Sequence, residues 1–406
     1  MENAGKILGG ILLVSGTTIG AAILALPVET GLAGFMPTLL LFLVYWVLMT
    51  FSACLFLEVD LWIKEPGVNI ISMARETLGK PGEAVSWVLY LILLYTLTTA
   101  YMAASGPLFL SFLSYVSGIE MPNWVGPLPL ILIFSFFVYE GAKYVDYLNR
   151  FLMFGLVLTY IVLNFWLLPY MDVDLLAYRN WRFLPLAVAL TATSFGYHII
   201  IPTVTRYLDR NVRALLIVIL IGGAVPLIIN GVWVFVTLGI IPLGGPAGLI
   251  EGYAEGLNAV DLIILNVGSP WLSYVAQWFL FFAIVTSFLG VSLSLRDFLT
   301  DGLGVENTPS GRWSIYFLTF VPPLFFALTV HRVFFKALDY AGMIGVLALL
   351  VVMPIVMVWR GRYRKNFKSP LFKTPGGKPA LAAACGVAAL MILLELGNKI
   401  GIFRYF

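Results

Sequence analysis

Charged residues are scarce in this sequence: they make up 11% of its 406 residues, against about 25% in soluble proteins. Hydrophobic residues, by contrast, make up 61%. This balance leaves no room for a sizeable soluble domain. It places the chain among integral membrane proteins.

Cysteine and histidine are also scarce, with two residues of each. Cys54 and Cys385 both lie in apolar runs, so they give neither a disulfide framework nor a metal-binding spacing. The sequence has no Cys/His pair and no HExxH spacing, so it lacks the nucleophile or metal set of an intramembrane enzyme. We therefore expect no enzymatic activity, no cofactor, no metal site and no nucleic-acid partner.

Apolar runs of about 20 residues, the length that crosses a bilayer as a helix, occur eleven times. They cover residues 6–30, 35–62, 84–113, 124–140, 148–170, 183–205, 213–241, 270–295, 313–330, 336–359 and 379–399. The sequence therefore predicts an all-α polytopic membrane protein with eleven spans.

Lysine and arginine are distributed unevenly between the connections. With the amino terminus in the cytoplasm, 18 of the 24 lie on the inner side and 6 on the outer side. This asymmetry fits the positive-inside rule. It predicts a cytoplasmic amino terminus and an outer carboxyl terminus. The basic run from Arg360 to Lys378 could also contact anionic lipid, although topology alone explains it.

Two connections are long enough to carry structure of their own. The inner one, 63–83, predicts a short interfacial helix that ends at Gly79. The outer one, 244–261, is either a lid containing a short helix or an ordinary solvated loop. It has no basic residue and three acidic ones, Glu251, Glu255 and Asp261.

The first span contains a polar block at its centre. Glycines weaken a helix, and hydroxyls at mid-membrane need partners where no water reaches. The block therefore predicts an unwound hinge whose free N–H and carbonyl groups bind a zwitterion. The alternative is a close-packing face formed by two glycines four residues apart. The block consists of Ser15, Gly16, Thr17, Thr18, Ile19 and Gly20.

The sixth span repeats this pattern, with a hydroxyl and glycine block from Thr191 to His198. Each interrupted helix is the first of a set of five spans. This order predicts an inverted repeat of units 1–170 and 183–359, followed by a basic loop and an eleventh span over 360–406. Paired interrupted spans in such a repeat indicate the binding site of a secondary transporter. This correspondence favours hinges over packing glycines.

Five motifs resemble the tryptophan/tyrosine permease family of the amino acid permease superfamily: Ser15–Pro27, Leu57–Val59, Leu97–Tyr101, Phe195–His198 and Thr286–Leu293. The resemblance covers nearly the whole chain. It implies a leucine-transporter-type fold, with a five-plus-five inverted repeat and an eleventh helix. It also implies import of tyrosine or tryptophan, usually by proton symport, across a bacterial inner membrane, with the carboxyl terminus in the periplasm.

The sequence departs from the family pattern at three positions. Ala22 and Ile23 stand where glycine and methionine are expected, and Arg296 stands where an aromatic residue is expected. The first two would narrow the pocket, and Arg296 would lie at the inner gate.

The predicted substrate site combines the two breaks with span three. The N–H groups of Thr17–Gly20 would bind the carboxylate, and the carbonyls near Ser15–Thr17 and Thr193–Phe195 would bind the amino group. One face of span three adds hydroxyls and an aromatic ring, although hydroxyls often bond to their own helix instead. That face carries Thr98, Tyr101, Met102 and Ser105, and the second break adds Thr193, Ser194, Phe195, Gly196 and Tyr197.

Four residues are candidates for ion coupling. His198 is the only histidine expected at depth and could carry a proton, or it could be a neutral, hydrogen-bonded imidazole. Glu58 could also carry a proton, or its side chain could simply extend to the membrane interface. Thr286 and Ser287 are adjacent hydroxyls that could bind sodium, which keeps a sodium-coupled symporter of neutral amino acids as the alternative.

An uncoupled channel is the rival from another class. It would need a continuous polar stripe through several spans. Here the polar residues cluster at mid-depth between apolar ends, so we favour the transporter, with an amino acid, a coupling ion and membrane lipid as its partners.

Overall fold

Helices are the only regular elements in the part of the chain that the computed structural model describes, residues 2–63, 68–305, 308–367 and 371–402. Three of the basic residues assigned to a side of the membrane, Lys64, Lys368 and Arg404, lie outside these ranges.

The long helices coincide with the predicted spans. In the described residues nine helical segments are long and apolar enough to cross a membrane, and the bent pair α1–α2 makes a tenth. The pair consists of α1 (Glu2–Thr18) and α2 (Ala22–Gly31). The nine segments are α3 (Phe35–Trp62), α5 (Lys80–Ser117), η1–α6 (Asn123–Glu140), α7–η2 (Ala142–Tyr170), η4–α9 (Trp181–Tyr207), α10 (Val212–Leu238), α13 (Pro270–Leu303), α15–α16 (Val333–Tyr363) and α17 (Gly377–Lys399).

The remaining predicted span, 313–330, corresponds to α14 (Pro309–Thr329), a helix of 21 residues. It is not among the ten apolar segments. Its polar first turns, with Ser310, Arg312 and Ser314, and its internal proline pair make it less apolar than its neighbours.

Two of the spanning segments consist of three or more helical pieces. The sixth consists of η4 (Trp181–Ala187), α8 (Val188–Thr193), η5 (His198–Ile200) and α9 (Ile201–Tyr207). The predicted span 336–359 consists of α15 (Val333–Tyr340), the π-helical η6 (Ala341–Val352) and α16 (Met353–Tyr363).

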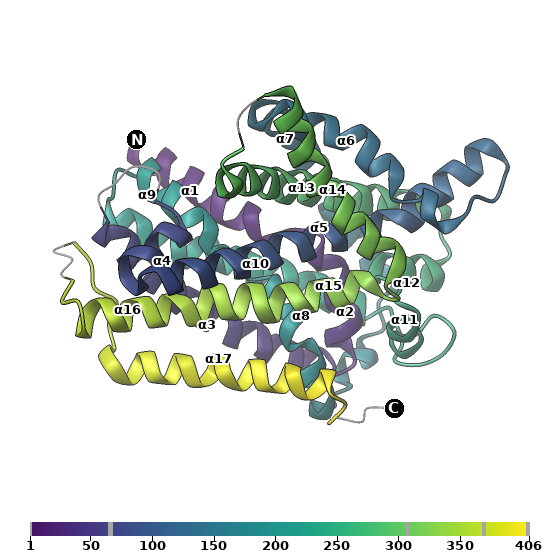
Figure 1. Ribbon diagram of the computed structural model, residues 1–406. Coiled ribbons are helices and arrows are strands. Elements are labelled where there is room, and N and C mark those ends of the chain that lie inside the picture. Colours follow the sequence, from purple (N-terminus) through teal and green to yellow (C-terminus); the bar gives the residue numbers. More distant parts are fainter. Residues whose placement is uncertain (1, 64–67, 306–307, 368–370, 403–406) are drawn as a thin grey trace.

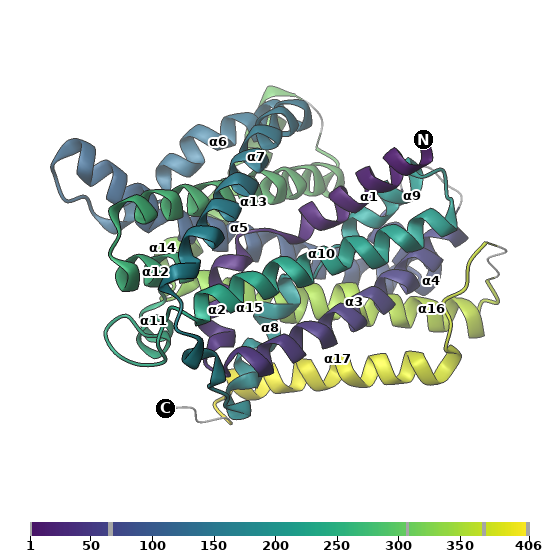
Figure 2. The same cartoon turned by 180° about the vertical axis from the view of Figure 1, so that it is seen from behind.

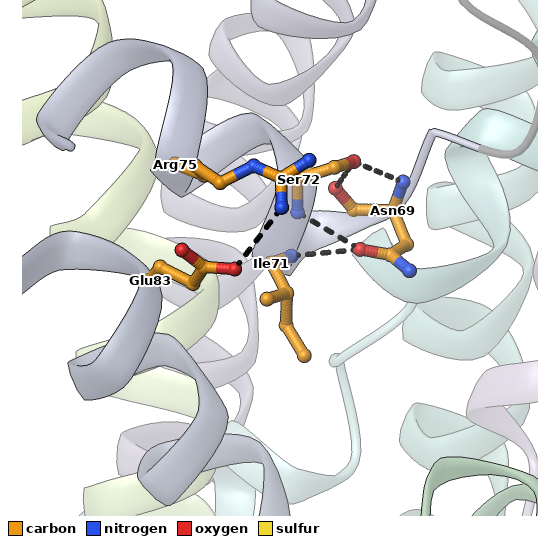
Figure 3. Close-up of polar contacts among 5 residues, drawn as sticks. All are labelled: Asn69, Ile71, Ser72, Arg75 and Glu83. Atoms are coloured by element: carbon orange, nitrogen blue, oxygen red, sulfur yellow. Dashed lines mark hydrogen bonds and ion pairs between the residues drawn. The ribbon is translucent and has the colours of Figure 1, made fainter. Parts of the chain in front are cut away.

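The predicted inner helix is present as α4 (Ile70–Leu78), drawn in Figure 3. The Asn69 side chain accepts hydrogen bonds from the N–H groups of Ile71 and Ser72, and the Ser72 hydroxyl accepts one from the Asn69 N–H. Such reciprocal bonds satisfy N–H groups that a helix start leaves free. At the other end Gly79, with φ of 78°, adopts a backbone conformation that favours glycine and stops the helix.

The outer connection folds into two short helices, α11 (Leu249–Glu255) and α12 (Ala259–Val267), which both pack against α2. The Asp261 carboxylate accepts a bond from Asn258 Nδ2 at 2.6 Å. Burial raises the pKa of Asp261 to about 6, although a backbone hydrogen bond from Asn258 opposes this. The connection therefore contains structure that could form a lid, and that role stays a prediction.

The two breaks are held in the middle of the bundle by their neighbours. α1 packs against α10, and α13 packs against both α5 and α7. Trp233 of α10 is fully buried and donates from its indole nitrogen to the Ile23 carbonyl of α2 at 2.9 Å.

α17 lies at the edge of the bundle, against η6, α8 and η4. Figures 1 and 2 show that α1 begins at one end of the bundle and α17 ends at the other.

Candidate functional site

The first break lies where α1 ends and α2 begins, and the two helices are bent by 60° relative to each other. The Ile19 N–H closes α1 by donating to the Ser15 carbonyl at 3.1 Å. On the other side of the break, the Ile23 N–H donates to the Gly20 carbonyl at 3.1 Å. The predicted interruption of span one is therefore confirmed.

Several main-chain groups at this break have no hydrogen-bond partner among the described residues. The described residues offer no hydrogen-bond acceptor to the N–H groups of Gly20 and Ala22, and no donor to the carbonyls of Thr17 and Thr18. The start of a helix carries a partial positive charge and its end a partial negative charge. One short stretch of chain thus presents both signs, which is the requirement for binding a zwitterion.

Three of the predicted residues from three different spans meet at Gly20. Ser287 of α13 accepts a hydrogen bond from the Ala21 N–H at 2.9 Å. A Cβ atom on Gly20 would lie 2.9 Å from Ser287 Oγ and 3.9 Å from the Tyr101 hydroxyl of α5. Only a residue without a side chain fits here without displacing Ser287.

The hydroxyls of α1 are engaged elsewhere. Ser15 donates to the Ile11 carbonyl at 2.7 Å, and Thr17 and Thr18 donate to the Val14 carbonyl at 2.8 and 3.0 Å. The N–H groups of Thr17 and Thr18 belong to the last turn of α1. The groups left open for a ligand are therefore the main-chain atoms between the two helices.

The predicted face of span three lies on α5 and is buried. Thr98 donates to the Leu94 carbonyl at 2.8 Å and Ser105 to the Met102 carbonyl at 2.7 Å, so both hydroxyls bond within their own helix. Met102 is fully buried. Of these four residues, Tyr101 is the one whose polar atom reaches the break at Gly20.

The second break follows Thr193, where α8 ends, and lasts until η5 begins at His198. Thr193 Oγ1 donates to the Leu338 carbonyl of α15 at 2.9 Å and fastens the end of α8. The described residues provide no donor to the carbonyls of Ser194 and Phe195. This interruption is also confirmed, and it leaves carbonyls available for a positively charged group.

The aromatic residues of the second break pack into the protein core. The Phe195 ring is 1% exposed, stacks on Tyr45 with centroids 6.3 Å apart and lies 5.7 Å from the Phe42 ring. Tyr197 stacks on His198 at 5.2 Å. A Cβ atom on Gly196 would lie 3.2 Å from Val346, which explains the small residue at this point.

His198 is completely buried, with the Phe56 ring at 6.0 Å. Neither of its ring nitrogens has a hydrogen-bond partner among the described residues. No carboxylate or hydroxyl of the described residues is therefore hydrogen-bonded to the imidazole. Its role in coupling stays a prediction.

The other three coupling candidates have defined partners. Thr286 donates to the Phe282 carbonyl at 2.7 Å, within its own helix, whereas Ser287 binds the first break. Glu58 forms a buried ion pair with Arg362 and accepts the Thr374 N–H at 2.8 Å. No group of three or more possible metal ligands from His, Cys, Asp and Glu occurs in the described part of the chain.

Three carboxylates inside the spans are not among the site residues predicted from the sequence. Glu29 of α2 and Glu395 of α17 are 2% and 3% exposed, and the Asp339 side chain of α15 is 17% exposed. All three stand in runs that were read as apolar spans. Their charge in an apolar run was the signal that could have identified them.

Comparison with known proteins gives one family over almost the whole chain. The profile of the tryptophan/tyrosine permease family matches residues 3–395. The tyrosine-specific transport system 1 of Haemophilus influenzae is 33% identical over 404 residues, which is 98% of each chain. The tryptophan-specific transport protein of the same organism is 28% identical and covers 100% of this chain and 99% of its own.

Among solved structures, MhsT in complex with L-phenylalanine superposes with a TM-score of 0.66 at 14% identity, over 96% of this chain and 97% of that chain. This likeness shows the fold, which is of the leucine-transporter type, as expected from the sequence. The positions of the repeat boundaries stay a prediction.

Proposed function

Since the chain belongs to the tryptophan/tyrosine permease family, a family of membrane transporters rather than enzymes, we propose that it imports tyrosine or tryptophan as a secondary active transporter. The observation that carries the proposal is the first break, where free N–H groups and free carbonyls lie within a few residues of each other. A free amino acid has the matching pair of charges.

In the proposed complex, the N–H groups of Gly20 and Ala22 bind the substrate carboxylate, and carbonyls of both breaks bind its ammonium group. Each hydrogen bond to a charged group contributes about 1.5–3 kcal/mol. These bonds offset the cost of removing the zwitterion from water. The side chain then extends toward α5, where Tyr101 lies next to Gly20.

The coupling ion is proposed to be a proton. Sodium is the second candidate, because Ser287 and the carbonyls of the first break could bind it together with Thr286. We further propose an inner membrane location with a cytoplasmic amino terminus. The opposite placement of the start of α1 and the end of α17 supports putting the termini on opposite sides.

The test of the function is uptake by purified protein in proteoliposomes. Labelled tyrosine or tryptophan is expected to accumulate when the lumen is made alkaline relative to the medium, and not when only a sodium gradient is imposed. Competition by unlabelled amino acids then ranks the substrates. Accumulation that follows sodium and ignores the pH gradient would replace the proton by sodium.

Side-chain selectivity is expected to depend on Tyr101 more than on Phe195. Tyr101→Ala should weaken tryptophan and tyrosine by no more than a few kcal/mol, the scale of a buried ring contact, and should affect alanine less. Phe195→Ala should affect all substrates alike, because its ring packs on Phe42 and Tyr45. Binding of the three amino acids to both variants measures the difference, and equal losses in Tyr101→Ala would assign that ring to the gate or the fold.

A further inference from the structure

Three buried or nearly buried carboxylates inside the spans come from three different helices. Glu29 lies near the end of α2, Asp339 in α15 and Glu395 in α17. We refer to these three residues as the carboxylate cluster. All three are buried or nearly so, and Glu29 is 2% exposed.

The cluster has more negative groups than close positive ones. Lys399 Nζ lies 3.0 Å from Glu395 Oε1 and 3.9 Å from Asp339 Oδ2. Within the described residues no hydrogen-bond partner is present for Glu29 Oε2 or Asp339 Oδ1. Lys399 therefore lies closer to Glu395 than to Asp339. In the described part of the chain, Glu29 is left as a buried carboxyl group without a counter-ion in contact.

The charged groups that face Glu29 come from several elements. Asp339 and Glu395 repel a negative charge on Glu29, whereas Arg332 and Lys399 attract it. The Arg332 guanidinium itself lies over the Tyr253 ring of α11, with 4.0 Å to the centroid. The positive charge of Arg332 is thus shared between Glu29 and the Tyr253 ring.

Burying a lone ionised carboxylate costs so much that such a group usually takes up a proton instead. A metal ion would serve equally well, but the described residues contain no group of ligands that could hold one. The chemistry of the cluster therefore points to a proton as its ligand.

The position of Glu29 connects this cluster with the first break. Glu29 follows Ala22, the first residue of α2, by seven residues, which corresponds to about 10 Å along a helix. α2 starts with the free N–H groups and ends next to α11 and α12. A change in the way Glu29 is held at one end of this short helix would therefore alter the position of the N–H groups at the other.

We propose that Glu29, buried near the end of α2, binds the transported proton and couples it to the substrate through α2. The inference rests on the proposed function, because it assumes that the first break binds the amino acid. The proton adds to a carboxylate oxygen of Glu29 and later leaves the same oxygen, and no other bond changes.

The test is Glu29→Gln in proteoliposomes, which keeps the shape of the side chain and removes the titratable group. One coupled proton supports about a tenfold accumulation for each unit of pH difference. We expect this accumulation to be lost in Glu29→Gln, while exchange of labelled tyrosine for unlabelled tyrosine continues. Asp339→Asn should shift the pH dependence of accumulation without abolishing exchange. Glu255→Gln, the same change at an exposed position of α11, should behave like the unmodified protein.

The competing residue is His198. If His198→Gln abolishes pH-driven accumulation and Glu29→Gln retains it, the proposal is wrong. The same holds if Glu29→Gln and Asp339→Asn both accumulate normally, or if Glu29→Gln folds and loses exchange and accumulation to the same extent. In the last case the cluster would be a static part of the fold.

A substrate-independent measurement separates this proposal from the proposed function. Infrared difference spectra of the purified protein during a pH titration should contain the band of a protonated carboxyl group that is missing in Glu29→Gln. If this band is missing in Glu29→Gln but neither amino acid is transported, the cluster binds a proton and the substrate assignment fails. If the unmodified protein has no such band, or Glu29→Gln retains it, Glu29 does not hold the proton. The infrared result decides whether Glu29 holds the proton, and the transport assays decide whether that proton is coupled to the substrate.

Discussion

Gly20→Val is expected to abolish substrate binding while membrane insertion and helical structure are retained. A Cβ atom at this position would lie 2.9 Å from Ser287 Oγ, so Ser287 has to move and the Ala21 N–H loses its acceptor. The side chain also covers the free N–H groups at the start of α2. Losing two hydrogen bonds to a charged group, at about 1.5–3 kcal/mol each, weakens binding roughly a hundredfold or more.

The measurement is equilibrium binding of labelled tyrosine or tryptophan to the purified variant, with circular dichroism and gel filtration to verify folding. Gly290→Val is a matched control in the same helix as Ser287, because a Cβ atom there meets no atom within 4 Å. If correctly folded Gly20→Val binds with unchanged affinity, the carboxylate binds somewhere else.

The two breaks could be predicted because their cause is local. Glycines and hydroxyls in the middle of an apolar run disfavour a continuous membrane helix whatever surrounds them. The same block occurring in two spans at the same place in the chain order strengthened that prediction. For the same reason the inner helix α4, which depends on Asn69 and Gly79 at its own ends, was predictable.

The direction of individual side chains could not be predicted in the same way. A serine or threonine in a helix can bond to its own preceding turn or to a neighbouring helix, and the sequence allows both. Thr98 and Thr286 take the first option, and Ser287 takes the second because α13 passes next to Gly20. That proximity is determined by the packing of helices that lie far apart in the sequence.

Glu58 shows the same limit for charges. Its position near the end of span two is compatible with coupling and with the membrane interface. The structure buries it against Arg362, which is 304 residues away, and its role in coupling stays a prediction. The carboxylate cluster is a different case, because Glu29 and Glu395 were visible in the sequence as charges inside apolar runs.

Arg362→Met is expected to destabilise the protein by about 3–5 kcal/mol, because it leaves Glu58 buried without its partner. The two side chains are only 5% and 2% exposed, so water cannot replace the lost interaction. Arg150→Met is the same change in the exposed Arg150–Asp146 pair, where the side chains are 79% and 62% exposed. It should lower the stability by about 0.5 kcal/mol or less. Reversible denaturant unfolding in mixed micelles measures both.

The double variant Glu58→Gln/Arg362→Met tells a structural ion pair from a coupling residue. If the pair only holds α3 against α16, removing both charges should recover much of the stability that Arg362→Met loses. Since coupling is proposed to lie at Glu29, pH-driven accumulation in the double variant should recover together with its stability. A double variant that is stable and exchanges substrate, yet no longer accumulates it, would show that Glu58 itself takes part in coupling. That outcome would make the inner end of the bundle, where Glu58 binds the Thr374 N–H and Arg362, the place where the proton leaves.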